Sequence, residues 1–359
     1  MDQKDTNAQN SNARALLSRF SNPRARWTAV CSETPADSIR RNGVETMRLS
    51  RTRWWKYRLA LSYQTRFKAL FYPGPHWSDE LGIRTRTLSG RRVPIIATFE
   101  GIIAPAHATE DLSNLVGHQV FSEPFADNVI PRLRWMYGIA DHIIAISPFL
   151  ARAAKFLYGD KVSWLPLGIE ACIFHNAGRH EPSRCRVVAC GSVKIRKNPQ
   201  LFLRLAARYP QADFVWFGDG PMLQHLTGEA KRMCLENLHF AGPTEPQQLA
   251  EEFRQSSIFV LPSNAEGVPK VTQEAAACGL PIVLNGFYEA PTVIHESNGL
   301  VAWSEDELID HVGALIQDPR ARAKMGERGA AMASEWNWDR VAPRWEELVI
   351  QLATSKGPA

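Results

Sequence analysis

The stretch FVLPSNAEGVPKVTQEAAACGLPIV, residues 259–283, decides the fold of this chain, because it joins a strand, a turn and a helix in a short span. The apolar run Ile258–Leu261 predicts a buried strand. Residues 263–268 predict a loop, and residues 269–277 predict a helix that opens at a proline and stops at Gly279. A strand followed closely by a helix is the repeating unit of a doubly wound α/β sheet.

Two acids in this stretch are spaced so that both can face one ligand. Glu266 lies in the loop after the strand, and Glu274 lies eight residues later, about two turns into the helix. Carboxylates accept hydrogen bonds from hydroxyl groups, while the free N–H groups at a helix N-terminus suit a phosphate. A sugar nucleotide carries both kinds of group. The competing interpretation is that the two acids only favour the helix N-terminus electrostatically.

Apolar runs bounded by Gly, Pro and Asn alternate with helical patterns along the chain, which predicts parallel sheets with helices on both faces. In the first half these runs predict strands at Trp27–Cys31, Val44–Leu49, Ala69–Phe71, Pro94–Thr98, His142–Ile146 and Val162–Leu165. In the second half they predict strands at Arg186–Cys190, Asp213–Phe217, Leu238–Ala241, Ile258–Leu261, Pro281–Leu284 and Leu300–Trp303. Ser147, Pro148 and Gly159 predict the cap, first residue and stop of a helix.

The order of these patterns predicts two domains. Gly, His, Pro and Asn cluster at Gly168–Ser183, as is typical of a linker between domains. We therefore expect an N-terminal domain over residues 1–167 and a C-terminal domain over residues 168–337. The apolar face of residues 338–359 predicts a final helix. A chain of 359 residues is long enough to bury two separate cores.

The opening stretch resembles the signature of retaining GT-B glycosyltransferases of the GT4 family, glycosyl transferases group 1, whose form EGxPKxxxEAxACGxPIV it follows. ADHIIAISPFL at residues 140–150 is similar to the last strand and helix of the family's N-terminal domain. RVVACGSVKIRKNPQLFLRLA at residues 186–206 is similar to the first strand, turn and helix of its C-terminal domain. The resemblance implies two Rossmann-like domains facing across a cleft, with the C-terminal helix crossing back to the first domain.

The resemblance also implies which residues bind a nucleotide-sugar donor. Glu274 would bind the ribose, and Glu266 would bind the hydroxyl groups of the donor sugar. Lys197 and the backbone N–H groups of Gly267 and Val268 would hold the diphosphate. Loops after neighbouring strands would contact the nucleotide at Gly191, Ser192, Gly218, Gly242 and Pro243. For Lys197 the alternative is a solvated lysine in a basic run.

The chain departs from the family at three places. Ser192 stands where the family often has Arg, and Arg196 is a candidate substitute. Glu100 stands where the family commonly has a cleft histidine; it could accept the proton of an acceptor hydroxyl, as a catalytic residue beside Glu266 and Lys197, or only form hydrogen bonds. The first ten residues are polar, so the family's opening strand is not visible. If that strand was lost, the first sheet should have an unfilled central position or an exposed apolar groove, whereas a domain that has adapted would fill the position with another segment.

Composition limits the partners. With 45% apolar and 22% charged residues the chain is globular, and no segment approaches the roughly 18 apolar residues of a membrane span. The polar N-terminus lacks the apolar core of a signal peptide, which predicts a cytoplasmic protein. The six cysteines show no zinc spacing, so we expect no metal and no cofactor besides the donor. A net charge of +5 fits an anionic substrate, and no nucleic-acid-binding module is recognisable.

Basic and aromatic residues alternate in Arg48–Lys68, which includes Trp54, Trp55 and Tyr57. This composition suits peripheral contact with an anionic membrane, where a transferase would meet a lipid-linked acceptor. The competing interpretation is an ordinary amphipathic helix packed on the sheet.

Together these features predict a retaining glycosyltransferase that moves a sugar from a nucleotide-sugar donor to a carbohydrate or lipid-linked acceptor, in cell-surface polysaccharide or glycolipid synthesis. The alternatives are a GT-B sugar-nucleotide epimerase or hydrolase, and a degenerate protein that binds a nucleotide sugar without catalysis.

Overall fold

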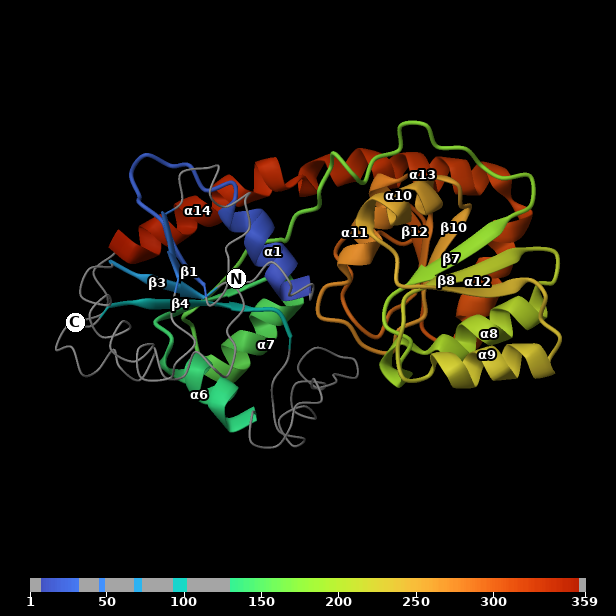
Figure 1. Cartoon of the computed structure of the whole chain (residues 1–359), viewed down its shortest axis with the longest axis horizontal. Coiled ribbons are helices and arrows are strands. Elements are labelled where there is room, and N and C mark those ends of the chain that lie inside the picture. Colours follow the sequence, from blue (N-terminus) through green and yellow to red (C-terminus); the bar gives the residue numbers. More distant parts are fainter. Residues whose placement is uncertain (1–7, 32–44, 49–67, 73–92, 102–129, 355–359) are drawn as a thin grey trace. The chain divides into compact units, whose positions relative to one another are not determined.

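The computed structural model describes residues 8–31, 45–48, 68–72, 93–101 and 130–354 (Figure 1). The chain divides into two compact units. Of the described residues, the first unit contains those up to residue 168 together with residues 338–354, and the second contains residues 169–337.

The second unit is built on a six-stranded parallel sheet in the order β12-β11-β10-β7-β8-β9. Its strands are β7 (Arg186–Cys190), β8 (Asp213–Phe217), β9 (Leu238–Gly242), β10 (Ile258–Leu261), β11 (Ile282–Asn285) and β12 (Gly299–Ala302). β10 and β11 are buried along their whole length, as expected for central strands covered by helices on both faces. β9 lies at one edge of the sheet, and its residues are only half-buried or exposed.

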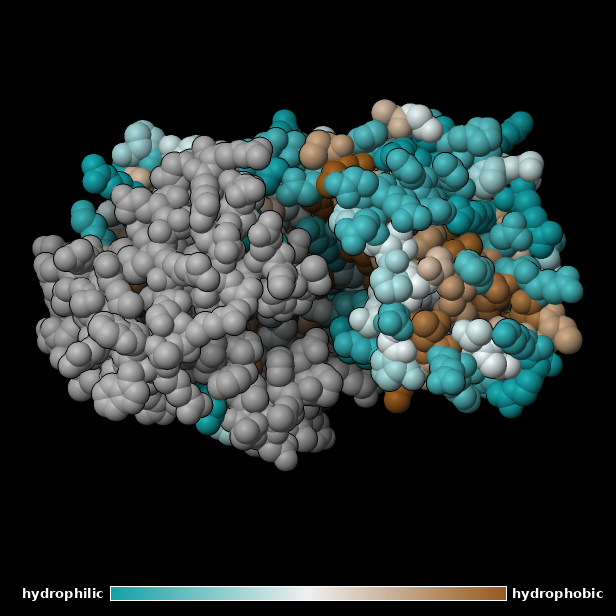
Figure 2. Space-filling model, viewed as in Figure 1, coloured by the Kyte–Doolittle hydropathy of each residue, from teal (hydrophilic) through white to brown (hydrophobic). Residues whose placement is uncertain are grey.

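Helices cover both faces of this sheet, as Figure 1 shows, with α8, α9 and α12 on one side and α10, α11 and α13 on the other. They are α8 (Pro199–Arg208), α9 (Leu223–Arg232), α10 (Pro246–Arg254), α11 (Lys270–Ala277), α12 (Glu305–Gln317) and α13 (Pro319–Ala333). Figure 2 shows hydrophobic side chains between α9 and α10 on the viewed face, in keeping with the incomplete burial of β9. Because all six strands are parallel, the loops after their carboxyl ends emerge at one edge of the sheet.

The first unit contains two parallel sheets, one with the order β3-β4-β5-β6 and one formed by β1 and β2. The strands are β1 (Thr28–Cys31), β2 (Glu45–Arg48), β3 (Leu70–Tyr72), β4 (Ile95–Phe99), β5 (His142–Ala145) and β6 (Val162–Trp164). The helices are α1 (Ala8–Leu17), α6 (Ile130–Ile139), α7 (Pro148–Tyr158) and α14 (Trp338–Thr354).

The final helix, α14, packs within the first unit, so the chain returns to this unit at its end. The fully buried Trp345 donates its indole N–H to Pro166 O at 2.8 Å. The buried carboxylate of Glu346 accepts the backbone N–H groups of Ser21 at 3.0 Å and Asn22 at 2.9 Å, and the indole N–H of Trp27 at 2.7 Å. These bonds fasten the segment that leads into β1.

The predicted fold class is confirmed, and every predicted strand coincides with an observed strand to within one residue at either end. The predicted helix after Ser147 is also confirmed, because the Ser147 hydroxyl accepts Leu150 N–H and Gly159 ends the helix. The predicted first residue of the helix at 269–277 was wrong. Pro269 is the cap of α11 rather than its first residue, since its ψ of 84° is not helical and its carbonyl accepts Thr272 N–H.

Two predictions fall on residues outside the described ranges. They concern the basic and aromatic segment, of which residues 49–67 are not described, and the missing opening strand, which was predicted from the first ten residues, of which 1–7 are not described. Both stay predictions. Among the helices that are described, none has the length and apolar character needed to cross a membrane.

Candidate active site

Three glycines bring the ends of neighbouring strands together in the second unit. Gly191 follows β7, Gly218 follows β8, and Gly242 ends β9. Gly218 N–H donates to Gly242 O at 2.7 Å, and Gly191 N–H donates to Phe217 O at 2.9 Å. A Cβ on Gly218, whose φ is +136°, would lie 2.2 Å from Gly191 O. Glycine at this position is therefore required for the close approach of the two loops.

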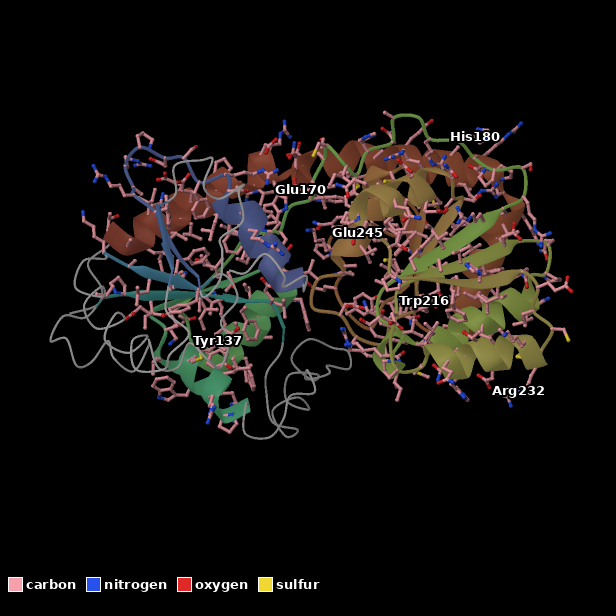
Figure 3. All side chains as sticks on the ribbon, viewed as in Figure 1. Tyr137, Glu170, His180, Trp216, Arg232 and Glu245 are labelled. Carbon is pink, nitrogen blue, oxygen red and sulfur yellow. The ribbon has the colours of Figure 1, made fainter. Side chains whose placement is uncertain are left out.

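Trp216 fixes the turn at Gly191 with a hydrogen bond from the core. Its side chain is fully buried on β8, and its indole N–H donates to Gly191 O at 2.9 Å. Figure 3 shows Trp216 inside the second unit, at the sheet. The backbone of the Gly191 turn is thus fixed by the core.

A buried carboxylate and two cations form the centre of the site. The Lys197 Nζ atom lies 2.5 Å from Glu266 Oε1, and the Arg196 Nη1 atom lies 3.1 Å from Glu266 Oε2. The Glu266 side chain is only 7% exposed. Lys197 ends a short 3₁₀ turn (Ile195–Lys197) just before α8, so both cations lie beside a helix N-terminus. The Lys197 side chain passes over Gly191, where an added Cβ would lie 3.4 Å from Nζ.

The loop that carries Glu266 is bonded to the Arg196 loop by its backbone as well. Arg196 donates from Nη1 to Ala265 O at 2.5 Å, and Asn264 N–H donates to Arg196 O at 2.9 Å. Two loops that are about seventy residues apart in the sequence therefore form one hydrogen-bonded unit.

Glu266 is held in its ionised form. Burial by itself raises the pKa of this carboxyl group, but the charges of Lys197 and Arg196 and the hydrogen bond from Lys197 outweigh burial. The net effect is a pKa below the ordinary value. An ionised carboxylate offers only acceptors, so it can accept hydrogen bonds from sugar hydroxyl groups.

Glu274 has the opposite electrostatic environment. It lies on α11 with its side chain 16% exposed, and its nearest cation is Lys270, whose Nζ is 4.0 Å away. Burial raises the pKa of Glu274, and the charge of Lys270 offsets this only in part. Glu274 and Lys197 both influence Cys190, whose pKa burial raises to about 12, so both lie near the end of β7.

The structure brings together most of the residues predicted from the sequence. Gly267 and Val268 lie between Glu266 and the start of α11, while Ser192 and Pro243 are exposed in the loops after β7 and β9. Arg196, the proposed substitute for the cation missing at Ser192, shares the carboxylate of Glu266 with Lys197. Within the described ranges, no cluster of His, Cys, Asp and Glu is arranged to hold a metal ion.

Glu100 belongs to the first unit, directly after β4. Tyr137 is buried in the same unit, where Figure 3 labels it, and donates its hydroxyl to Thr98 O at 3.0 Å. Burial, the neighbouring Tyr158 and the charge of Glu100 raise the pKa of Tyr137 well above its ordinary value. Glu100 therefore lies close to Tyr137, whose ring packs against that of Tyr158.

Two further side chains at the site were not predicted. Asn285 and Tyr288, from the end of β11 and the loop after it, donate hydrogen bonds to the backbone that leads to Glu266. The loop NGFYEAP at residues 285–291 was the available signal, but it says nothing about which carbonyl groups its side chains reach.

Comparison with known proteins shows which family this part of the chain is similar to. Residues 174–332 match the family model for glycosyl transferases group 1. The chain is 26% identical over 285 residues to a GDP-mannose-dependent monoacylated alpha-(1-6)-phosphatidylinositol monomannoside mannosyltransferase of Corynebacterium glutamicum, covering 71% of this chain and 73% of that protein. It is 25% identical over 279 residues to an alpha-galactosylglucosyldiacylglycerol synthase of Streptococcus pneumoniae, covering 72% and 70% of the two chains.

Solved structures share the fold across nearly the whole chain. Anabaena Alr3699/HepE in complex with UDP and glucose superposes with a TM-score of 0.75 at 14% identity, covering 98% of both chains. Sucrose-phosphate synthase from Thermosynechococcus elongatus gives a TM-score of 0.71 at 18% identity, covering 98% of this chain and 94% of the other. The chain shares the GT-B fold of these glycosyltransferases, and its residues 174–332 match the family model for glycosyl transferases group 1.

Proposed function

We propose that this glycosyltransferase transfers a sugar, with retention of anomeric configuration, from a nucleoside diphosphate sugar to a hydroxyl group of a carbohydrate or lipid-linked acceptor. The observation that carries the proposal is the cluster of Lys197, Arg196 and Glu266 at the start of α8, beside Glu274 on α11. It combines cations for a diphosphate with carboxyl groups for hydroxyls.

The diphosphate is the group that the cations suit. Lys197 and Arg196 carry two positive charges against the single negative charge of Glu266, so the cluster keeps one net positive charge. The helix N-terminus adds a favourable field for an anion. As the bond to the sugar breaks, negative charge grows on the departing diphosphate, and cations fixed in advance stabilise it.

The two carboxyl groups would bind the neutral parts of the donor. Glu266, kept ionised by its two cations, would accept hydrogen bonds from the hydroxyls of the transferred sugar. Glu274 would bind the ribose from α11. The N–H groups of Gly267 and Val268 would complete the diphosphate site, whereas Pro269 has no N–H to donate.

The class of acceptor is inferred from the relatives and not from the site. Both relatives compared above are named for products or acceptors that contain lipid, which supports a glycolipid as the product, with a cell-surface polysaccharide as the alternative. Peripheral contact of Arg48–Lys68 with an anionic membrane belongs to the same proposal. We expect no obligatory metal, since the two cations supply the charge that a metal would otherwise provide.

Calorimetry with a panel of nucleoside diphosphates tests the donor site and identifies the base. Lys197→Ala and Glu274→Ala should each weaken binding by roughly 1.5–3 kcal/mol, the cost of one charge-assisted hydrogen bond. Glu266→Ala should bind the free nucleoside diphosphate at least as well as the wild type and should abolish transfer. Lys194→Ala, in the same loop, is the matched control. Unchanged affinity in both the Lys197 and Glu274 variants would rule out this donor site.

A further inference from the structure

Three successive carbonyl groups at the exit of β10 are bonded by side chains from one short segment. Asn285 donates from Nδ2 to Pro262 O at 2.9 Å and to Ser263 O at 3.2 Å. Tyr288 donates its hydroxyl to Leu261 O at 3.3 Å. Asn285 is fully buried and Tyr288 is 4% exposed, so water does not supply these bonds.

These bonds act where the sheet stops supporting the chain. β10 pairs with β11 as far as Leu261, and its ladder with β7 covers Ile258 and Phe259. Beyond Leu261 the backbone leaves the sheet as a loop, and its buried carbonyl groups need other partners. The Asn285 amide donates to two of these carbonyl groups, those of Pro262 and Ser263. It therefore acts as a clamp on the first residues of the loop that carries Glu266.

The same loop is fastened from its opposite end by the bonds of Arg196 and Lys197 described above. The charge of Glu266 contributes, after burial, to the raised pKa of Tyr288, so the Tyr288 ring lies close to this carboxylate. The Glu266 loop is therefore held between the segment after β11 and the segment before α8.

We propose that Asn285 and Tyr288 are positioning residues for Glu266: by holding the three carbonyl groups at the exit of β10, they place the Glu266 carboxylate for the donor sugar. The inference rests on the proposed function for its effect on catalysis, but the clamp itself is a property of the unliganded protein. Neither side chain needs to touch the substrate.

Matched pairs of variants separate this role from general stability. Tyr288→Phe removes one buried hydroxyl that donates to a carbonyl, and Tyr209→Phe removes a partly buried one elsewhere in the unit, where Tyr209 donates to Ile309 O at 2.9 Å. Asn285→Ala removes an amide clamp. Asn237→Ala removes another, since Asn237 Nδ2 donates to Ala206 O and Ala212 O, each at 3.0 Å.

Two measurements on the full chain decide the matter. Hydrogen exchange of the amides at residues 263–267 should be faster in Tyr288→Phe and Asn285→Ala than in the wild type, and unchanged in the two controls. The rate constant of transfer, kcat, should fall at least about tenfold in both site variants, because a displacement of about 1 Å at a reacting group can cost about a hundredfold. Affinity for the nucleoside diphosphate should stay within about twofold of the wild type, because the variants leave both cations in place.

Each outcome has a distinct meaning. Exchange at residues 263–267 equal to that of the controls would overturn the clamp, whether or not the protein proves to be a transferase. Faster exchange with kcat no lower than in the controls would overturn the positioning role. If the wild type transfers no sugar from any donor, the proposed function fails, and the exchange experiment still tests the clamp.

Discussion

The ion pair of Lys197 and Glu266 should contribute measurably to folding, and a double-mutant cycle can isolate that contribution. At the observed 2.5 Å and an effective dielectric constant of about 20, two unit charges attract by about 6–7 kcal/mol. Removing each ion from water costs several kcal/mol, so most of this attraction is offset. The remainder should be about 2 kcal/mol, within the range of roughly 1.5–3 kcal/mol for charge-assisted hydrogen bonds.

The cycle consists of Lys197→Met, Glu266→Gln and the double variant, each unfolded in urea. Lys197→Met should lower the free energy of unfolding by about 2 kcal/mol, or about 4–8 °C in Tm for a unit of this size. The coupling energy should be about 2 kcal/mol. The exposed pair of Arg204 and Glu305, with side chains 49% and 45% exposed, should couple by at most about 1 kcal/mol. A coupling for Lys197 and Glu266 no larger than for this surface pair would refute the reasoning.

Three other outcomes can be checked by unfolding experiments. Glu274→Gln should raise the Tm at neutral pH and leave it unchanged below pH 4, because a carboxyl group with a raised pKa loses its stabilising contribution as pH rises through the pKa of the folded state; equal effects at both pH values would contradict this. Gly218→Ala should cost about 2 kcal/mol or more in urea unfolding, since its Cβ would meet Gly191 O at positive φ, whereas Gly228→Ala, with open space around it, should not destabilise. Glu346→Ala should destabilise the first unit by about 2–3 kcal/mol by leaving three partly buried N–H groups without their acceptor, and an effect below about 0.5 kcal/mol would show that water replaces it.

The strands could be predicted because the signals for them are local. A run such as Val187–Ala189 is apolar because both faces of the sheet are covered, and turn residues mark its ends. The helix after Ser147 could be predicted for the same reason, since its cap, first residue and stop each follow from a separate local preference. Pro269 shows the limit of such rules, because proline is typical of the first helical position, yet the ψ angle of 84° makes this proline the cap instead.

The contacts within the site could not be predicted in the same way. Nothing in the sequence near Lys197 indicates that its partner is Glu266, because the pairing arises only when β7 and β10 become neighbours in the sheet. The resemblance to a family indicated both residues, but as separate contacts to a donor. Asn285 and Tyr288 were missed for a similar reason, since their partners are backbone carbonyl groups, which carry no side-chain signal.

The two acids that first identified the stretch 259–283 differ most in their charge, although they are the same residue type eight positions apart. Glu266 has two cations within 3.1 Å and a lowered pKa, whereas Glu274 has one cation at 4.0 Å and a raised pKa. Environments that push two equivalent groups apart are typical of sites that assign them different tasks. The cations that keep Glu266 ionised are also the groups that suit a diphosphate. If the donor binds as proposed, Lys197 and Arg196 must be shared between an internal carboxylate and an external anion, so removing the Glu266 carboxylate should not weaken the affinity for the diphosphate.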